Sequence, residues 1–106
     1  MAFHGGIHRN ADPIYEFPDT RIVKHMVEGL PLRVSALRSL GGYANIFSLE
    51  SFMDELAEEL GRDPLTFRLA HLRNPRDRAV LNAAATAANW RQAPRNEGYG
   101  QGLAFA

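Results

Sequence analysis

The segment from Ala44 to Leu60 constrains the fold most, because its apolar residues recur at the spacing of an α-helix. Members of this apolar stripe lie three or four residues apart along the chain: Ile46, Leu49, Met53, Leu56 and Leu60. Most of the acidic residues of the segment fall on the opposite side. Gly61 follows directly, and glycine takes the left-handed conformation that ends many helices. The sequence therefore predicts an amphipathic helix that stops at Gly61.

Two further helices are indicated by a repeated start signal, an N-cap residue followed by proline at the first helical position. The signal occurs at Asp63-Pro64 and at Asn74-Pro75. The apolar residues that follow predict a helix to about Leu72 and a second, alanine-rich helix to about Asn89. Trp90 is expected to anchor the end of the last helix.

Extended structure is expected on both sides of the helices. The β-branched and alternating residues from Thr20 to Glu28 favour a strand, and Leu32 to Leu37 favours a second extended piece. The end of the chain, Gly100 to Ala106, has the composition of the first residues of another strand. The predicted fold class is therefore α+β, with short N-terminal strands, three helices and a terminal strand. A chain that ends on an apolar strand is expected to have been cut from a longer one, since a strand needs partners for its backbone groups.

Composition narrows the classes of function. Twelve Lys plus Arg balance twelve Asp plus Glu among 106 residues, so bulk charge predicts neither nucleic-acid binding nor a polybasic membrane contact. The absence of cysteine from this sequence excludes disulfides and thiolate metal sites within it. No apolar run reaches the roughly 20 residues of a membrane span, and the first residues do not resemble a signal peptide. The sequence leaves the compartment undetermined.

The best candidate for ligand binding is the stretch SALRSLGGYAN, which leads into the first predicted helix. Helix N-termini attract anions because their backbone N–H groups and the helix dipole point at the ligand. Arg38 adds a permanently charged planar group suited to phosphate or a polarised oxygen. An ordinary turn with a surface arginine explains the same residues, since the stretch matches neither the dinucleotide fingerprint nor the P-loop.

Other polar clusters have simpler explanations. His4 and His8 are separated by Gly5-Gly6, which disfavours the helix that a metal pair at this spacing needs. His25 is expected to be a packed strand residue rather than a catalytic one. The acidic run is interpreted as a solvated helix face with a Glu58 to Arg62 ion pair, rather than as a metal site: Asp54, Glu55, Glu58 and Glu59.

Three stretches together resemble the molybdopterin-binding large subunit of the xanthine dehydrogenase and aldehyde oxidase family. They are YEFPDTR, the long stretch ALRSLGGYANIFSLESFMDELAEELGRDPLTFRLAHL, and the terminal GQGLAF. In that family a stretch of the type AFRGFGGPQ precedes a helix carrying E-x-x-MDELA and then a G-x-DP-x-x-FR segment. The matching positions are Glu50, Met53 to Ala57, Gly61, Asp63, Pro64, Phe67, Arg68 and Leu72. Within the family, the sequence of the second stretch is most similar to the branch that includes isoquinoline 1-oxidoreductase, nicotinate dehydrogenase and membrane-bound aldehyde dehydrogenases.

The resemblance implies a cofactor-binding role for five residues ahead of the long helix: Arg38, Ser39, Leu40, Gly41 and Gly42. Arg38 matches the motif arginine beside the molybdenum centre, and the two glycines match those that let backbone approach the cofactor. Ser39 stands where the family pattern has glycine, and Leu40 where it has phenylalanine. Ala44 replaces the usual glutamine.

The resemblance also implies a reaction and partners. Family members oxidise aldehydes or N-heteroaromatic compounds by attack of a molybdenum-bound hydroxide and hydride transfer, with a glutamate as base. That glutamate belongs to a GxGE-type motif that this sequence lacks, so no catalytic residue and no metal ligand is expected here. The implied partners are the rest of the large subunit and an Fe–S small subunit. The parent is expected to be of bacterial type, either cytoplasmic or membrane-associated and periplasmic.

The expected organisation is a flexible lead-in over residues 1–13 and a partial molybdopterin-binding domain over residues 14–106. The isolated chain is expected to bind no cofactor and to be inactive, and its exposed apolar surface to favour self-association. A free-standing protein-interaction module and a small anion-binding domain built on the Arg38 loop remain as alternatives. A reading frame that ends at Ala106 would favour the interaction module.

Overall fold

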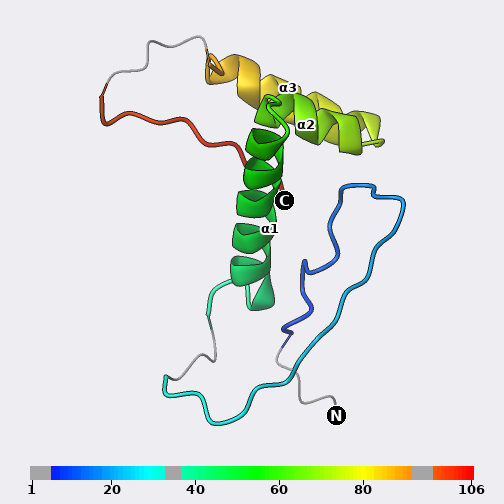
Figure 1. Ribbon diagram of the computed structural model, residues 1–106, viewed down its shortest axis with the longest axis vertical. Helices are drawn as coiled ribbons and strands as arrows, with labels where there is room; N and C mark the ends of the chain where they lie inside the picture. The colour runs from blue at the N-terminus through cyan, green and yellow to red at the C-terminus, as the bar shows by residue number, and fades with distance from the viewer. Residues whose placement is uncertain (1–5, 33–36, 92–96) are drawn as a thin grey trace.

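The structure is a computed structural model that describes residues 6–32, 37–91 and 97–106. Within these ranges it has three helices, α1 (Gly41–Glu59), α2 (Pro64–His71) and α3 (Pro75–Ala87). α1 packs against α2, and α2 packs against α3. Figure 1 shows α2 and α3 lying across one end of the long α1, while the N-terminal part of the chain makes a wide open loop beside them.

The ends of the helices follow the predicted signals. Gly61 has a φ of 62°, and its N–H bonds to the carbonyl of Glu58 while the N–H of Arg62 bonds to that of Ala57. This pair of bonds is the Schellman arrangement that closes a helix. Asn89, with a φ of 49°, plays the same part after α3. The predicted stop at Gly61 is confirmed.

The starts of α2 and α3 are also confirmed. The side chain of Asp63 accepts a hydrogen bond from the N–H of Thr66, and that of Asn74 accepts one from the N–H of Arg76. A proline follows each cap at the first helical position. α1 begins earlier than predicted, at Gly41 rather than Ala44, so the two glycines lie in its first turn.

A small apolar core forms where the three helices meet the two ends of the chain. Its buried members come from the N-terminal segment and from all three helices: Tyr15, Met53, Ala57, Phe67, Leu72 and Leu81. Leu103 and Phe105, from the other end of the chain, pack against it. The ring of His71 lies between those of Phe17 and Phe67, with centroids 5.0 and 4.6 Å away. The core therefore depends on contacts that no single helix supplies.

The prediction of an α+β fold with strands is wrong. The described residues contain no strand, and the segments 20–28 and 100–106 are irregular. Of the expected piece from Leu32 to Leu37, residues 33–36 lie outside the described ranges. Between residues 17 and 32 no backbone group bonds to another described backbone group. Alternation and β-branching favour a strand only when a neighbouring strand accepts its hydrogen bonds, and this chain brings none alongside.

Candidate functional site

The five residues singled out by the sequence lie at the start of α1. Arg38, Ser39 and Leu40 form a turn in which the N–H of Leu40 bonds to the carbonyl of Leu37 at 3.0 Å. Gly41 and Gly42 then begin the helix. The side chain of Arg38 is exposed, and its guanidinium makes no hydrogen bond or ion pair with any described residue. The turn thus presents a free positive charge beside a helix N-terminus.

The turn is held in an uncommon backbone conformation. Ser39 has a φ of 67° and Leu40 a φ of 53°, values in the left-handed region where a side chain costs roughly 1–2 kcal/mol. Glycine would adopt such angles freely. The family pattern has glycine at the position of Ser39, so the structure gives a physical reason for that preference. Strain of this kind persists only where the surrounding chain holds it.

Because Gly41 and Gly42 have no side chains, the turn over residues 6–10 can approach the start of α1 closely. A Cβ on Gly41 would lie 2.5 Å from the carbonyl oxygen of Gly6 and 2.9 Å from the backbone of Ile7. The amide of Asn45 secures this approach by donating to the carbonyl of Ile7 at 2.8 Å and to that of Arg9 at 2.9 Å. The turn over residues 6–10 therefore lies directly on the start of α1. Sequence reasoning missed this contact, because a glycine pair does not say which backbone approaches it.

The N-terminus of α1 lacks the groups that usually neutralise it. Leu40 is the N-cap residue and offers no side-chain hydrogen bond, and the first turn contains no acidic residue. Helix N-termini carry partial positive charge and unused N–H groups, which favour anions. The N–H of Gly42 bonds to the carbonyl of Ser39, so the charge of Arg38 and the positive end of the helix dipole are the features that favour an anion here.

A cleft of about 660 Å³ runs from this turn along α1. Ser39, Gly42 and Asn10 line the end near the turn, and the exposed rings of Tyr43 and Phe47 line the helix side. The C-terminal segment forms another wall through Gly102, Leu103, Ala104 and Ala106. The cleft is mostly apolar, with carboxylates of Glu50 and Asp54 at its far end. An apolar cleft with a few polar groups at its ends is the usual form of a small-molecule site.

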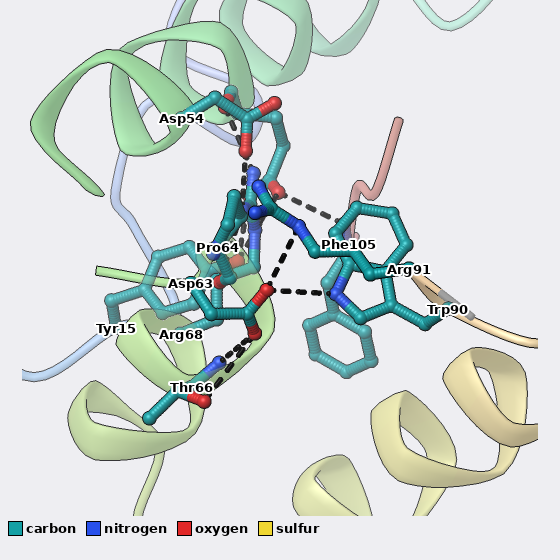
Figure 2. Close-up of polar contacts among 10 residues, drawn as sticks. Tyr15, Asp54, Asp63, Pro64, Thr66, Arg68, Trp90, Arg91 and Phe105 are labelled. Atoms are coloured by element: carbon teal, nitrogen blue, oxygen red, sulfur yellow. Dashed lines mark hydrogen bonds and ion pairs between the residues drawn. The ribbon is translucent and has the colours of Figure 1, made fainter. Parts of the chain in front are cut away.

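The carboxylates belong to a buried polar network centred on Arg68 (Figure 2). Arg68 is fully buried, and its Nε donates to Glu50 Oε2 at 3.0 Å. Its two terminal nitrogens donate to Asp54 Oδ1 at 2.6 Å and to the backbone carbonyl of Glu50 at 2.9 Å. Burial alone would lower the pKa of the guanidinium, but the hydrogen bonds that it donates to Asp54 and Glu50, with the negative charges of these groups, outweigh burial and raise that pKa. Arg68 therefore stays charged, as its buried carboxylate partner requires.

Glu50 gathers contacts from both ends of the chain. The hydroxyl of Tyr15 donates to Glu50 Oε1 at 2.9 Å, and the backbone N–H of Phe105 donates to Oε2 at 3.0 Å. Burial, followed by the nearby negative charge of Glu50, raises the pKa of the Tyr15 hydroxyl above its usual range. A buried carboxylate with this many donors is held in one orientation.

Sequence reasoning placed Asp54 on a solvated face and did not recognise the network. Asp54 pairs with Arg68, whereas Glu58 and Arg62 form no ion pair in the described structure. One signal was available, since Arg68 occupies a position on the apolar stripe of its helix between Leu65 and Leu72. A charge at such a position needs a buried partner, although the pattern does not say which one.

A second polar cluster joins the start of α2 to the end of α3 (Figure 2). Asp63 Oδ2 accepts from the indole N–H of Trp90 at 3.0 Å and from Arg91 Nε at 3.0 Å. Burial would raise the pKa of Asp63, but it is outweighed by the hydrogen bonds from Thr66 and Trp90 and by the charge of Arg91, so the pKa is lowered. Trp90 thus anchors the end of α3, as the sequence predicts.

The described residues contain no group of three or more His, Cys, Asp or Glu side chains placed to hold a metal ion. His4, one of the histidines considered above, lies outside the described ranges. His25 is exposed in an irregular segment, so its predicted place within a strand is wrong. Among the described helices, none has the length and apolar character needed to cross a bilayer.

Comparison with known proteins places these features in a family. The family model for the molybdopterin cofactor-binding domain matches residues 2–72, which include the turn, the whole of α1 and Arg68. The chain belongs to this family. The resemblance inferred from the sequence motifs is confirmed.

Three curated proteins are similar to the chain in sequence. A nicotinate dehydrogenase subunit of Pseudomonas putida is 33% identical, over 92% of this chain and 9% of that protein. The beta chain of isoquinoline 1-oxidoreductase from Brevundimonas diminuta, also a subunit, is 36% identical, over 69% of the chain and 10% of that protein. Xanthine dehydrogenase of Blastobotrys adeninivorans is 36% identical, over 56% of the chain and 4% of that protein. The chain thus spans a tenth or less of the length of these relatives, and no solved structure matches it.

Proposed function

We propose that this chain is part of the large subunit of a molybdenum hydroxylase and supplies one wall of its molybdopterin site. The wall consists of the turn and the first helical residues: Arg38, Ser39, Leu40, Gly41 and Gly42. Of these, Ser39 and Gly42 line the cleft. The observation that carries the proposal is the unpartnered Arg38 beside an uncapped helix N-terminus, in a chain of the cofactor-binding family. Residues 14–106 would form part of the cofactor-binding domain, with residues 1–13 as its lead-in.

The residues of the cleft fit such a cofactor chemically. Molybdopterin combines an anionic phosphate group with a flat pterin ring. Arg38 and the N–H groups at the start of α1 are suited to the anion. The exposed rings of Tyr43 and Phe47, farther along the same cleft, are suited to a flat ring system.

The cofactor, when bound, supplies the two-electron oxidising centre of the reaction. This chain would bind and orient it, and would exclude water with the apolar side of α1. Among the described residues that line the cleft, the carboxylates are those of Glu50 and Asp54. Both are engaged by Arg68, so neither is free to take a proton from substrate. The base would come from elsewhere in the protein, and the 106-residue chain alone would be inactive.

We infer the substrate class and the electron acceptor by analogy with the relatives. Nicotinate dehydrogenase and isoquinoline 1-oxidoreductase are named for N-heteroaromatic substrates. We extend this class, together with aldehydes, to the parent of the present chain. Both relatives are named as subunits, and we propose that the parent passes its electrons to a separate Fe–S subunit.

The proposal is tested with Arg38→Ala in the full-length protein. Loss of one charge-assisted hydrogen bond costs about 1.5–3 kcal/mol, so we expect cofactor affinity to fall by roughly tenfold or more. Molybdenum content of the purified protein and turnover of an N-heteroaromatic substrate are the measurements. Arg73→Ala is the matched control, since Arg73 is an exposed arginine paired with Glu16 and lies far along the chain from the turn before α1. Normal molybdenum content and turnover in Arg38→Ala would refute the role of Arg38.

A further inference from the structure

We infer that Glu50, held in place by Arg68, is a positioning residue that fixes the C-terminal wall of the cleft. The wall is the segment over residues 101–106, which returns to α1, and the C-terminus lies beside this helix (Figure 1). Its side chains alternate: Leu103 and Phe105 pack against the core, while Gly102, Ala104 and Ala106 are exposed. The three exposed residues line the cleft together with Leu103, whereas Phe105 does not line it. Of the four residues of this segment that line the cleft, three therefore have a small side chain or none.

The register of this segment decides which side chains face the cleft. In a segment with alternating side chains, a shift of one residue exchanges the two faces. Such a shift would turn the ring of Phe105 into the cleft and reduce its volume. At the start of the segment, the side chain of Gln101 donates to the carbonyl of Ala88 and accepts from the N–H of Arg91. Farther along, the backbone N–H of Phe105 donates to Glu50 Oε2 at 3.0 Å and fixes the register beside α1. The position of this carboxylate oxygen thus helps to keep the cleft open.

Arg68 fixes that oxygen. Its Nε donates to the same Oε2 at 3.0 Å, and a terminal nitrogen donates to the backbone carbonyl of Glu50. The guanidinium is itself held by Asp54 and by the carbonyl of Pro64 at 3.3 Å. A planar group with donors engaged on several sides cannot turn without breaking charged hydrogen bonds. The Arg68–Glu50 pair therefore acts as a rigid support rather than as a surface ion pair.

Overall stability alone does not require an ion pair at this place. A buried ion pair can often be replaced by apolar side chains of similar volume without loss of stability. Apolar replacements would keep the contacts between α1 and α2 but would provide no acceptor for Phe105. The two roles of the pair, stability and register, are therefore separable by substitution. This inference rests on the proposed function only where the cleft is taken to be a cofactor site.

Hydrogen exchange of the full-length protein, read by mass spectrometry, tests the inference. The double variant Glu50→Met with Arg68→Met removes the acceptor, whereas Glu50→Gln keeps an oxygen that can accept from Phe105. Glu55→Gln, an exposed carboxylate on the same helix, is the matched control. We expect peptides covering residues 99–106 to exchange about tenfold faster in the double variant, since a charge-assisted hydrogen bond is lost. Exchange in Glu50→Gln and Glu55→Gln should stay within about threefold of the parent, because each keeps the acceptor.

Two results in the double variant would overturn the inference. Unchanged exchange at residues 99–106 would show that the wall does not depend on Glu50. Equally faster exchange in α3 would show that the pair serves general stability. A second measurement uses the unaltered protein and does not depend on a variant folding: the Phe105 amide should exchange more slowly than those of Ala104 and Ala106. Equal rates at these three amides would also contradict the inference. None of these readouts involves the cofactor, so failure here and failure of the proposed function are distinguishable.

Discussion

Ser39 shows how much a single residue can cost beside a binding site. Its φ of 67° lies in the left-handed region, where a residue with a side chain is strained. Leu40, the next residue, also has a positive φ. The cost is met by the contacts of the neighbouring chain, including the turn over residues 6–10 that lies on α1. The backbone N–H groups that follow are thereby presented in a fixed direction, which benefits a site that binds through them.

We predict that Ser39→Gly stabilises the protein by about 1 kcal/mol, because glycine adopts a positive φ without a steric penalty. Urea denaturation measures the change. Ser48→Gly is the control, since Ser48 is an exposed residue in the middle of α1, where glycine costs up to about 1 kcal/mol. The same substitution should therefore have opposite signs at the two positions. Destabilisation at both would show that Ser39 is not strained in solution.

Tyr15 gives a test at alkaline pH. Burial beside Glu50 raises the pKa of its hydroxyl, so the folded state holds this proton more tightly than the unfolded state does. The contribution to stability is complete below the unfolded value of about 10 and is lost as the pH rises above it. We predict that unfolding free energies measured from pH 8 to 11 fall more steeply for the parent than for Tyr15→Phe. Tyr99→Phe, at an exposed position, should keep the steep fall.

At the level of elements, the helices are joined by their caps as well as by apolar contacts. Asp63 caps α2 and also accepts hydrogen bonds from Trp90 and Arg91 at the end of α3. At the other end of α2, Arg78 donates from α3 to the carbonyls of Leu69 and Leu72. Short helices are marginal by themselves, so these polar links stabilise the orientation in which α2 and α3 pack.

We predict that Asp63→Ala destabilises the protein by about 2 kcal/mol, compared with about 1 kcal/mol for Asn74→Ala. Both substitutions remove an N-cap bond, but only Asp63 also holds Trp90. The lowered pKa of Asp63 adds a pH dependence: its contribution is present above the unfolded value of 3.8 and is lost as the pH falls through the folded value. Denaturation at pH 7 and pH 3 measures both effects. Equal costs for the two caps at pH 7 would contradict the prediction.

The whole molecule is more open than a compact domain of its length. Its radius of gyration is 16.5 Å, whereas a compact chain of this size would have about 13 Å. Large apolar side chains are exposed along the open N-terminal loop, among them Ile22, Val23, Met26 and Val27. Together with Tyr43 and Phe47 on α1, they leave much apolar surface in water. This surface fits the proposal that more of the large subunit covers it.

We predict that the 106-residue chain self-associates when produced alone, because exposed apolar surface is buried by association. Sedimentation velocity over a range of concentrations should give species larger than 11.8 kDa. The double variant Val23→Lys with Val27→Lys places charges on the exposed loop and should shift the chain towards the monomer. A clean monomer of the unaltered chain at high concentration would exclude the prediction.

The sequence by itself determined the helices and their ends. Periodicity, the two cap-proline pairs and Gly61 are local signals, and local geometry is enough to satisfy them. The motifs also determined the family, because they combine residues along a long uninterrupted stretch. The five residues of the candidate wall were chosen from the same motifs, and their role in cofactor binding stays a prediction.

Tertiary structure decided what local signals could not. The segments 20–28 and 100–106 have strand composition but remain irregular, because a strand exists only where a second strand accepts its hydrogen bonds. Likewise, the choice of Glu50 as the partner of Arg68, and the meeting of Tyr15 and Phe105 on that carboxylate, join residues far apart in the sequence. Such contacts depend on how the helices cross and on where the two ends of the chain pack. Residue spacing within the sequence specifies neither.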